Sequence, residues 1–137
     1  MANNRAAIRT ALKTILSGAT TAGTNVYSHR ETALWKSELP AILIYSNEES
    51  TVPESLRATR YVRTLQLTVE ARVEATSNVD NTLDALLAEI ETIIVANPSI
   101  TATVLSTVQT NTEIRVESDG EKDIGVGVLT FECKYIA

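Results

Sequence analysis

Two spacings of hydrophobic residues divide the chain into helical and extended segments. In residues 4–16 the apolar side chains recur every three or four positions, which predicts an amphipathic helix. The same spacing predicts a second helix that is capped by residues 77–80 and runs to about Ala96, where Asn97-Pro98 ends it. The apolar stripe of this second helix comprises Leu83, Leu86, Leu87, Ile90, Ile93 and Ile94.

Other segments follow the period of two that is typical of strands. In residues 61–75 apolar and polar side chains alternate, which predicts a long half-buried strand. In residues 39–45, five apolar residues without alternation follow Pro40, so we expect a strand buried on both faces. Val26 and Tyr27 start a short strand, and residues 108–117 and 124–136 form a hairpin turned by Asp119-Gly120.

These elements predict the order α-β-β-β-α-β-β. We therefore expect an α+β fold, with two helices packed on a largely antiparallel sheet, as a single domain over residues 1–137. Gly125 and Gly127 in the last strand indicate a bulge or a close backbone approach. The predicted core contains Leu65, Leu67, Val69, Leu86, Ile90, Leu129 and Phe131.

Composition supports a globular protein. The chain has 137 residues, of which 44% are hydrophobic and 21% charged, and this excludes a collagen-like, low-complexity or disulfide-rich chain. The N-terminus lacks the apolar run of a signal peptide, and no apolar run is long enough to span a bilayer. With Cys133 as its one cysteine, we expect a soluble protein of a reducing compartment.

The net charge of −5 is unevenly distributed. Residues 1–68 carry eight Lys/Arg and five Asp/Glu, whereas residues 69–137 carry four and twelve. No basic cluster is dense enough for a nucleic-acid-binding face, and acidic surfaces repel phosphate. Tight DNA binding is therefore not expected.

Catalytic chemistry finds little support in the sequence. His29 is the one histidine and lies in a polar stretch, where a solvated or hydrogen-bonding role is expected. Cys133 lies on the apolar face of a predicted strand, where cysteine is usually an inert hydrophobe. Glu48 and Glu49 are adjacent in a stretch expected to be an exposed loop, which lacks the burial that tunes a catalytic pKa.

Metal and nucleotide motifs fail as well. Asp119-x-Glu121-x-Asp123 begins like a calcium loop, but Ile124 stands where glycine is needed and Thr130 where glutamate is needed. Gly125-Val126-Gly127 precedes a strand and not a helix, so it is no dinucleotide fingerprint. We expect no catalytic, cofactor or metal site and no enzyme activity.

The polar residues 46–60 are expected to form a long loop between two strands, and such loops often carry function. The loop is either a solvated connector or a segment that orders on contact with a partner. The polar face of residues 61–75 is likewise either solvated or a subunit contact. The candidate interface residues are Glu48, Glu49, Glu54, Arg57, Arg60, Arg63, Glu70 and Arg72.

The order of these features resembles the siphophage tail terminator proteins, the lambda-like minor tail protein U family. The resemblance starts with the short N-terminal helix that ends in a variable loop, and it strengthens at LPAILIY (residues 39–45), followed by the acids Glu48 and Glu49. It continues through the alternating strand at residues 63–73 and the helix that contains Asp84 and Leu87. It ends with the acidic turn at residues 119–121 and LTFECKY at residues 129–135.

The resemblance implies a hexameric ring that caps the head-proximal end of a tail tube, stops its polymerisation and forms the surface for head–tail joining. The implied partners are further copies of the chain, the tail tube protein and a head–tail connector or stopper protein. DNA passes through the lumen without specific binding, and no membrane or cofactor is involved. The implied location is the virion tail, with the host cytoplasm during assembly.

Two alternatives stay open. A tail-completion or head–tail joining neck protein shares the α+β architecture, and a small hydrolase or ligand-binding domain belongs to another class. Independently of the family, the charge asymmetry predicts that Arg57, Arg60 and Arg63 pair with the acidic C-terminal half of a neighbouring copy.

Overall fold

The computed structural model describes residues 4–28, 39–56, 59–75, 77–97, 100–101, 104–118 and 123–137. Two helices and five strands occur in these ranges. They are α1 (Asn4–Leu16), β1 (Val26–Tyr27), β2 (Ala41–Pro53), β3 (Tyr61–Ala75), α2 (Val79–Val95), β4 (Val104–Ser118) and β5 (Asp123–Ile136). The predicted order α-β-β-β-α-β-β is confirmed.

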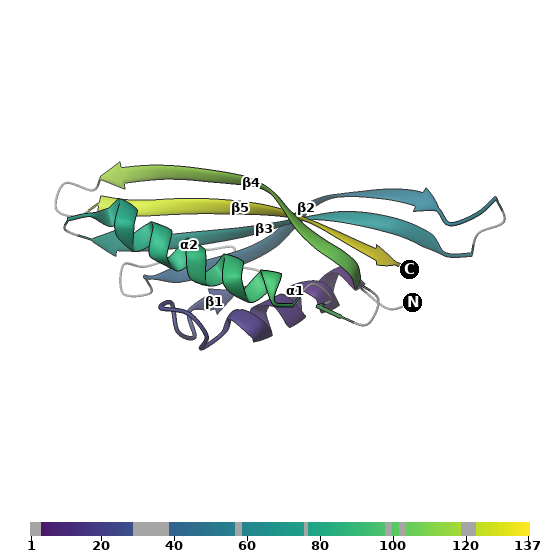
Figure 1. Ribbon diagram of the computed structural model, residues 1–137, viewed down its shortest axis with the longest axis horizontal. Coiled ribbons are helices and arrows are strands. Elements are labelled where there is room, and N and C mark those ends of the chain that lie inside the picture. The colour runs from purple at the N-terminus through teal and green to yellow at the C-terminus, as the bar shows by residue number, and fades with distance from the viewer. Residues whose placement is uncertain are drawn as a thin grey trace.

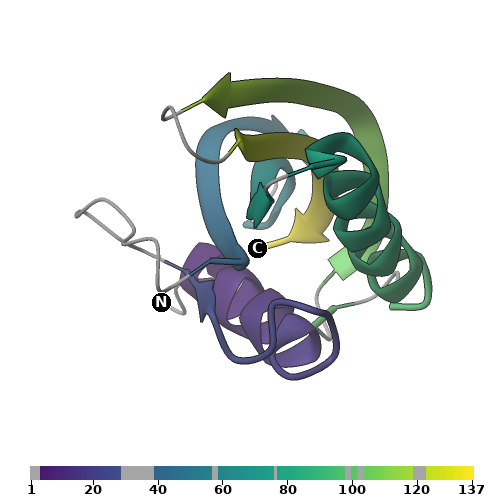
Figure 2. The same cartoon turned by 90° about the vertical axis from the view of Figure 1, so that its left-hand side faces the viewer.

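The described strands form one sheet in the order β1-β2-β3-β5-β4. β1 runs parallel to β2, and the other neighbouring strands are antiparallel. Figure 1 shows the strands following the long axis of the molecule, with both helices on the same side of the sheet. Figure 2 shows, end-on, that the sheet is strongly curved. The α+β class with a largely antiparallel sheet is therefore confirmed.

One hydrophobic core lies between the sheet and the two helices. The alternate residues of β3 that start at Leu65 point into it, as do those of β5 that start at Leu129. Ile8 and Leu12 of α1 and the apolar stripe of α2 close the core from the other side, with Ile93 only partly buried. Every residue that the sequence placed in the core is buried there.

Gly127 in β5 marks a close approach of helix to sheet. A Cβ atom added to Gly127 would lie 2.8 Å from Cδ1 of Leu87 in α2, which is closer than carbon atoms pack. Gly125 is less crowded, with 3.1 Å to the Val79 and Val73 side chains. Of the two alternatives that the sequence left open, the close approach is the one found.

The prediction of a loop over residues 46–60 is wrong for most of its length. β2 continues through Ser46 to Pro53, and its ladder with β3 extends from Ala41–Arg72 to Pro53–Tyr61. The segment is polar because it leaves the core and becomes solvated, and backbone hydrogen bonds to β3 keep it extended all the same. Within the described residues, only 54–56 and 59–60 form the connection between the strands.

Smaller differences occur at other element ends. β2 is buried on both faces from Ala41 to Ile42 and at Ile44, but Tyr45 is exposed. β4 begins at Val104 and not at residue 108. Asn78 precedes α2 in a left-handed conformation (φ 55°) without a side-chain capping hydrogen bond. His29 and the turn at residues 119–122 lie outside the described residues.

Neither α1 nor α2, the helices of the described ranges, has the length and apolar character needed to cross a membrane.

Candidate assembly interface

The hairpin of β2 and β3 continues past both helices as a projecting arm (Figure 1). We call residues 48–56 and 59–66 the β2–β3 arm. Its ladder pairs Glu48 with Gln66 and Pro53 with Tyr61, and the Glu54 N–H donates to the Arg60 carbonyl at 3.2 Å. Backbone hydrogen bonds therefore order the arm almost to its tip.

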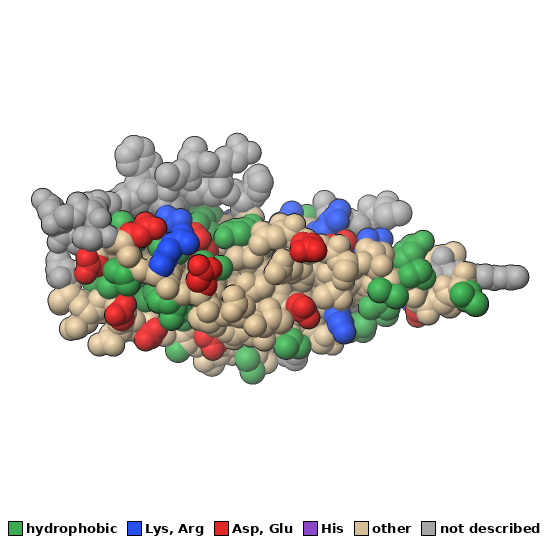
Figure 3. Space-filling view, turned by 90° about the horizontal axis from the view of Figure 1, so that it is seen from above, with side chains coloured by type: hydrophobic (Ala, Val, Ile, Leu, Met, Phe, Trp, Pro, Cys, Tyr) green, Lys and Arg blue, Asp and Glu red, His purple; other side chains and the backbone are tan. Residues whose placement is uncertain are grey.

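The outer part of the arm exposes apolar side chains. Leu56 is fully exposed, Val52 is 60% exposed and Tyr61 is 36% exposed. Figure 3 shows hydrophobic side chains gathered at this narrow end of the molecule. Large apolar groups clustered on a surface commonly mark a site of protein contact. We call Val52, Leu56 and Tyr61 the arm tip.

The base of the arm is held by the carboxylate of Glu49. Arg5 of α1 and Arg63 of β3 each donate to its Oε2, at 3.2 and 3.3 Å, and the hydroxyl of Tyr135 in β5 donates to Oε1. The Glu49 side chain is only 9% exposed, so these donors replace the water that it has lost. This Glu49 cluster joins one helix and three strands at one point.

Tyr135 is the buried member of this cluster. Burial, reinforced by the hydrogen bond to Glu49 and by its negative charge, raises the pKa of Tyr135 from 10.0 to about 12. The phenol is therefore neutral at physiological pH and acts as a hydrogen-bond donor. Arg63 also lies over the ring of Tyr61, with 5.6 Å from its guanidinium carbon to the ring centroid, which connects the cluster to the arm tip.

A β-bulge decides which glutamate enters the cluster. Ser46 pairs with Leu67 and Glu48 with Gln66, so Asn47 is an extra residue in β2. The Asn47 amide donates to Oγ1 of Thr68 at 3.0 Å. Because of the extra residue, Glu49 points to the helix side and Glu48 to the outer face, the face turned away from α1 and α2. The expectation that both acids lie in an exposed loop is therefore wrong for Glu49.

The remaining candidate residues fall into two separate groups. Glu54 and Arg60 form an ion pair at the end of the arm (3.0 Å), and Arg60 is mostly exposed. Glu70 and Arg72 form a second pair (2.9 Å) on the outer face of β3, far along the strand from the arm. Arg57 lies outside the described residues. The sequence thus grouped residues that the fold divides between the arm and the sheet.

The Glu70–Arg72 pair is more buried than an ordinary surface pair. The Glu70 side chain is 9% exposed, and Thr68 beside it on β3 is also buried. Partial burial, together with the charge of Glu70, raises the pKa of Tyr45 above 10.0. This half of the outer face is therefore not the plainly solvated surface that alternation suggests.

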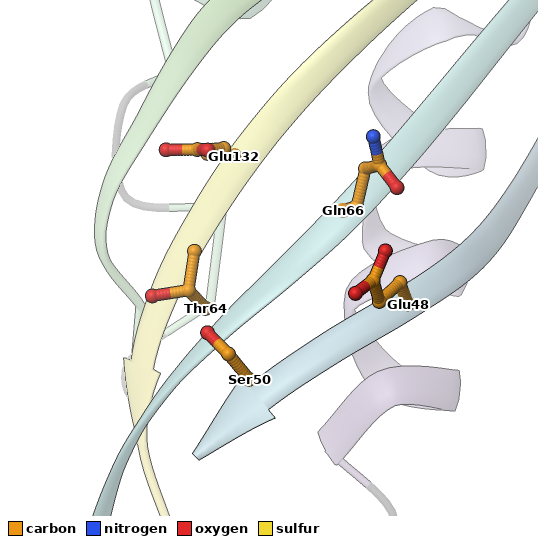
Figure 4. Close-up of a pocket in the computed structure, with 5 residues that line it drawn as sticks. All are labelled: Glu48, Ser50, Thr64, Gln66 and Glu132. Atoms are coloured by element: carbon orange, nitrogen blue, oxygen red, sulfur yellow. The ribbon is translucent and has the colours of Figure 1, made fainter. Parts of the chain in front are cut away.

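A shallow hollow of about 180 Å³ lies on the outer face near the arm. Figure 4 shows its five lining residues on β2, β3 and β5, with the carboxylates of Glu48 and Glu132 on different strands. The lining residues are Glu48, Ser50, Thr64, Gln66 and Glu132. Both carboxylates are solvent-exposed, and the described residues that line the hollow include no basic side chain, so they form an acidic polar patch.

The described residues contain no group of three or more side chains placed to hold a metal ion. Cys133 is fully buried, and burial raises the pKa of its thiol above 9.0, which keeps it protonated and unreactive, as expected. His29 lies outside the described residues.

Sequence reasoning missed residues that form the arm or hold its base. Arg5 and Tyr135 meet Glu49 across 44 and 86 residues of chain, and no local pattern announces such a contact. Leu56 could have been noticed, since it is a large apolar residue inside a polar stretch.

Known proteins resemble this chain both in fold and in sequence pattern. A chain in the virion of a native gene transfer agent particle has a similar structure, with a TM-score of 0.68. The match covers 99% of this chain and 100% of that chain at 13% identity, which shows a shared fold. No protein of curated function matches the sequence. Residues 3–135 match the family model of the phage minor tail protein U. The chain therefore belongs to the phage minor tail protein U family and is a structural component of a phage-type tail.

Proposed function

We propose that this chain forms a ring that caps the head-proximal end of the tail tube, ends tube polymerisation and provides the surface for head–tail joining. The observation that carries the proposal is the family match over residues 3–135, because tail termination is the role that the U family implies. The proposed partners are further copies of the chain, six in a ring, the tail tube protein and a head–tail connector or stopper protein.

The geometry is compatible with this role. A cap needs separate surfaces for its neighbours, for the tube and for the connector, and the chain has an arm that projects from its body and a broad outer sheet face. Among the candidate interface residues, Glu48, Glu54 and Arg60 are exposed and available for contacts. Glu49, Arg63, Glu70 and Arg72 form ion pairs within the chain, and in this proposal they support the interface from behind.

A conduit for DNA must not retain it. The net charge of −5 and the acidic patch between Glu48 and Glu132 repel phosphate. In this proposal DNA passes through the ring without specific binding. The ring is located at the head-proximal end of the tail in the virion, and it assembles in the host cytoplasm.

Interruption of the gene in the particle that encodes it tests the proposal. Electron microscopy is expected to show tails of irregular length and heads without tails, and a wild-type copy supplied in trans restores uniform tails. Tails of normal length that stay separate from heads would instead identify a neck protein that joins finished tails, and would overturn the terminator proposal.

A further inference from the structure

A shallow, open apolar hollow lies on the helix side of the molecule, between α2 and the segment that follows α1. It has a volume of about 370 Å³ and is lined mainly by small and apolar side chains. The lining residues are Ala19, Ala85, Ala88, Glu89, Thr92 and Ile93. We call it the α2 hollow.

The hollow is fixed by contacts on its rim. The backbone N–H of Thr21 donates to Oε2 of Glu89 at 2.8 Å, and its hydroxyl donates to Oε1. These hydrogen bonds hold the segment after α1 against α2. A hollow that exists before binding spares a partner the cost of forming it.

The arm tip offers a side chain of suitable size and chemistry. Leu56 is fully exposed at the end of an ordered hairpin. The arm extends beyond both helices, away from α2, so Leu56 cannot reach the hollow of its own chain (Figure 1). A contact between the arm tip and an α2 hollow therefore joins two copies.

Charge complements the apolar fit. α2 carries Asp80, Asp84, Glu89 and Glu91 and no lysine or arginine. In the segment that ends at Arg63, Glu54 is followed by three arginines, at positions 57, 60 and 63. Arg60 is mostly exposed, and its pairing with Glu54 at the surface is weak enough to be exchanged. Residues 54–63, at the end of the arm, thus carry three arginines and one glutamate, a charge opposite in sign to that of α2.

We propose that Leu56 of one copy seats in the α2 hollow of the next, while Arg60 faces the carboxylates of that helix. This inference rests on the proposed ring and specifies its contact. The two patches differ, so the contact is head-to-tail and can close into a ring. The exposed Ile114 and Val116 on β4 are a poorer docking site for an arm that carries Leu56, because Glu54 of the arm would meet Glu113 and Glu117 on either side of them.

Disulfide trapping tests the contact directly. Two variants, Leu56→Cys and Ala88→Cys, replace exposed residues, and native Cys133 is buried. Mild oxidation of the two variants mixed together is expected to yield a covalent dimer that neither variant yields alone. The double variant is expected to give a ladder of multimers in purified particles. A mixture of Leu56→Cys with Val116→Cys is the matched control and is expected to yield no dimer.

A second variant measures the contribution of the leucine. Burial of one leucine side chain corresponds to roughly a ten- to hundred-fold change in association, so Leu56→Asp is expected to weaken self-association by at least that factor. Val116→Asp, also at an exposed apolar site, is expected to leave it unchanged. Light scattering of the purified chains gives both values.

The outcomes separate this inference from the proposed function. Absence of the Leu56–Ala88 cross-link in both free protein and particles overturns the docking contact. If the cross-link is absent but particles that carry Leu56→Asp have tails of irregular length, the arm tip contacts the tube protein instead, and the terminator role stands. If the cross-link forms while gene interruption leaves tail length normal, the docking contact stands and the terminator role fails.

Discussion

At the scale of single residues, Glu49 determines how the arm is attached to the rest of the molecule. Its buried carboxylate accepts hydrogen bonds from three donors on three different elements. A carboxylate in this position is stable only because its donors replace water, so each donor contributes to the free energy of unfolding. Tyr135 is the donor best suited to a test, because its replacement by phenylalanine removes one oxygen atom.

Tyr135→Phe is expected to lower the free energy of unfolding at pH 7 by about 1.5–3 kcal/mol, the contribution of a hydrogen bond to a charged group. In the folded chain the pKa of Tyr135 is about 12, above its ordinary 10.0. The stabilisation is therefore complete below pH 10 and is lost as the pH rises from 10 to 12. Urea denaturation across this range is expected to show a smaller alkaline loss in the variant. Tyr45→Phe is the control, and an equal effect there would contradict the role of Glu49.

Gly127→Ala is expected to destabilise the fold by about 1–3 kcal/mol, because the new methyl group would overlap the buried Leu87 side chain. Gly125→Ala, with its longer contacts, is the control and is expected to cost less. In urea unfolding, the combination of Gly127→Ala with Leu87→Ala is expected to be less destabilising than the sum of the two single changes. Strict additivity would show that the helix is not in contact at Gly127.

At the scale of elements, the sequence predicted the helices and strands that pack an apolar face into the core. α1, β3, α2 and β5 have one apolar face each, and their periodicity placed them correctly. The outer half of β2 was missed because backbone pairing with β3, and not side-chain burial, holds it. The Glu49 cluster was missed for a related reason, since the bulge at Asn47 reverses the alternation and leaves no mark in the sequence.

Deletion of Asn47 is expected to remove the bulge and to leave the roles of the two glutamates unchanged. The buried residues Ala41, Ile42 and Ile44 fix the first half of β2, so without the extra residue Glu48 still pairs with Gln66, and Glu49 still lies on the helix side. In urea unfolding, Glu49→Gln is expected to destabilise and Glu48→Gln to be nearly neutral in both the full-length chain and the deletion variant. A reversed order in the deletion variant would show that Asn47 is not the extra residue of the strand.

At the scale of the whole molecule, the sequence shows an asymmetry of charge, and the fold determines where the acidic and basic side chains lie. The acidic half includes α2, while Arg60 and Arg63 lie on the arm. The pairing of these arginines with a neighbouring copy stays a prediction; within the chain, Arg60 meets Glu54 and Arg63 meets Glu49. Contacts across copies could not be read from one sequence, since they depend on surfaces that the fold assembles.

Self-association is expected to weaken several-fold, without disappearing, when salt is raised from about 0.05 M to about 0.5 M. The charged part of the arm contact is screened at these concentrations, while burial of Leu56 is not weakened by salt. Sedimentation of wild type and Arg60→Gln gives the comparison, and the variant is expected to show a shallower salt dependence. An equal salt dependence in both chains would show that Arg60 takes no part in the contact.

Because Cys133 is buried, the rate at which its thiol is modified measures how fast the surrounding structure opens. The thiol lies on β5 between Leu65 of β3 and Thr107 of β4 and belongs to the core between the sheet and the helices, so a reagent can reach it only when this core opens. Its modification rate therefore reports opening of the core, whereas separation of copies at the arm leaves it covered. A thiol reagent added to intact particles and to free chains would time these two events separately, with no label introduced.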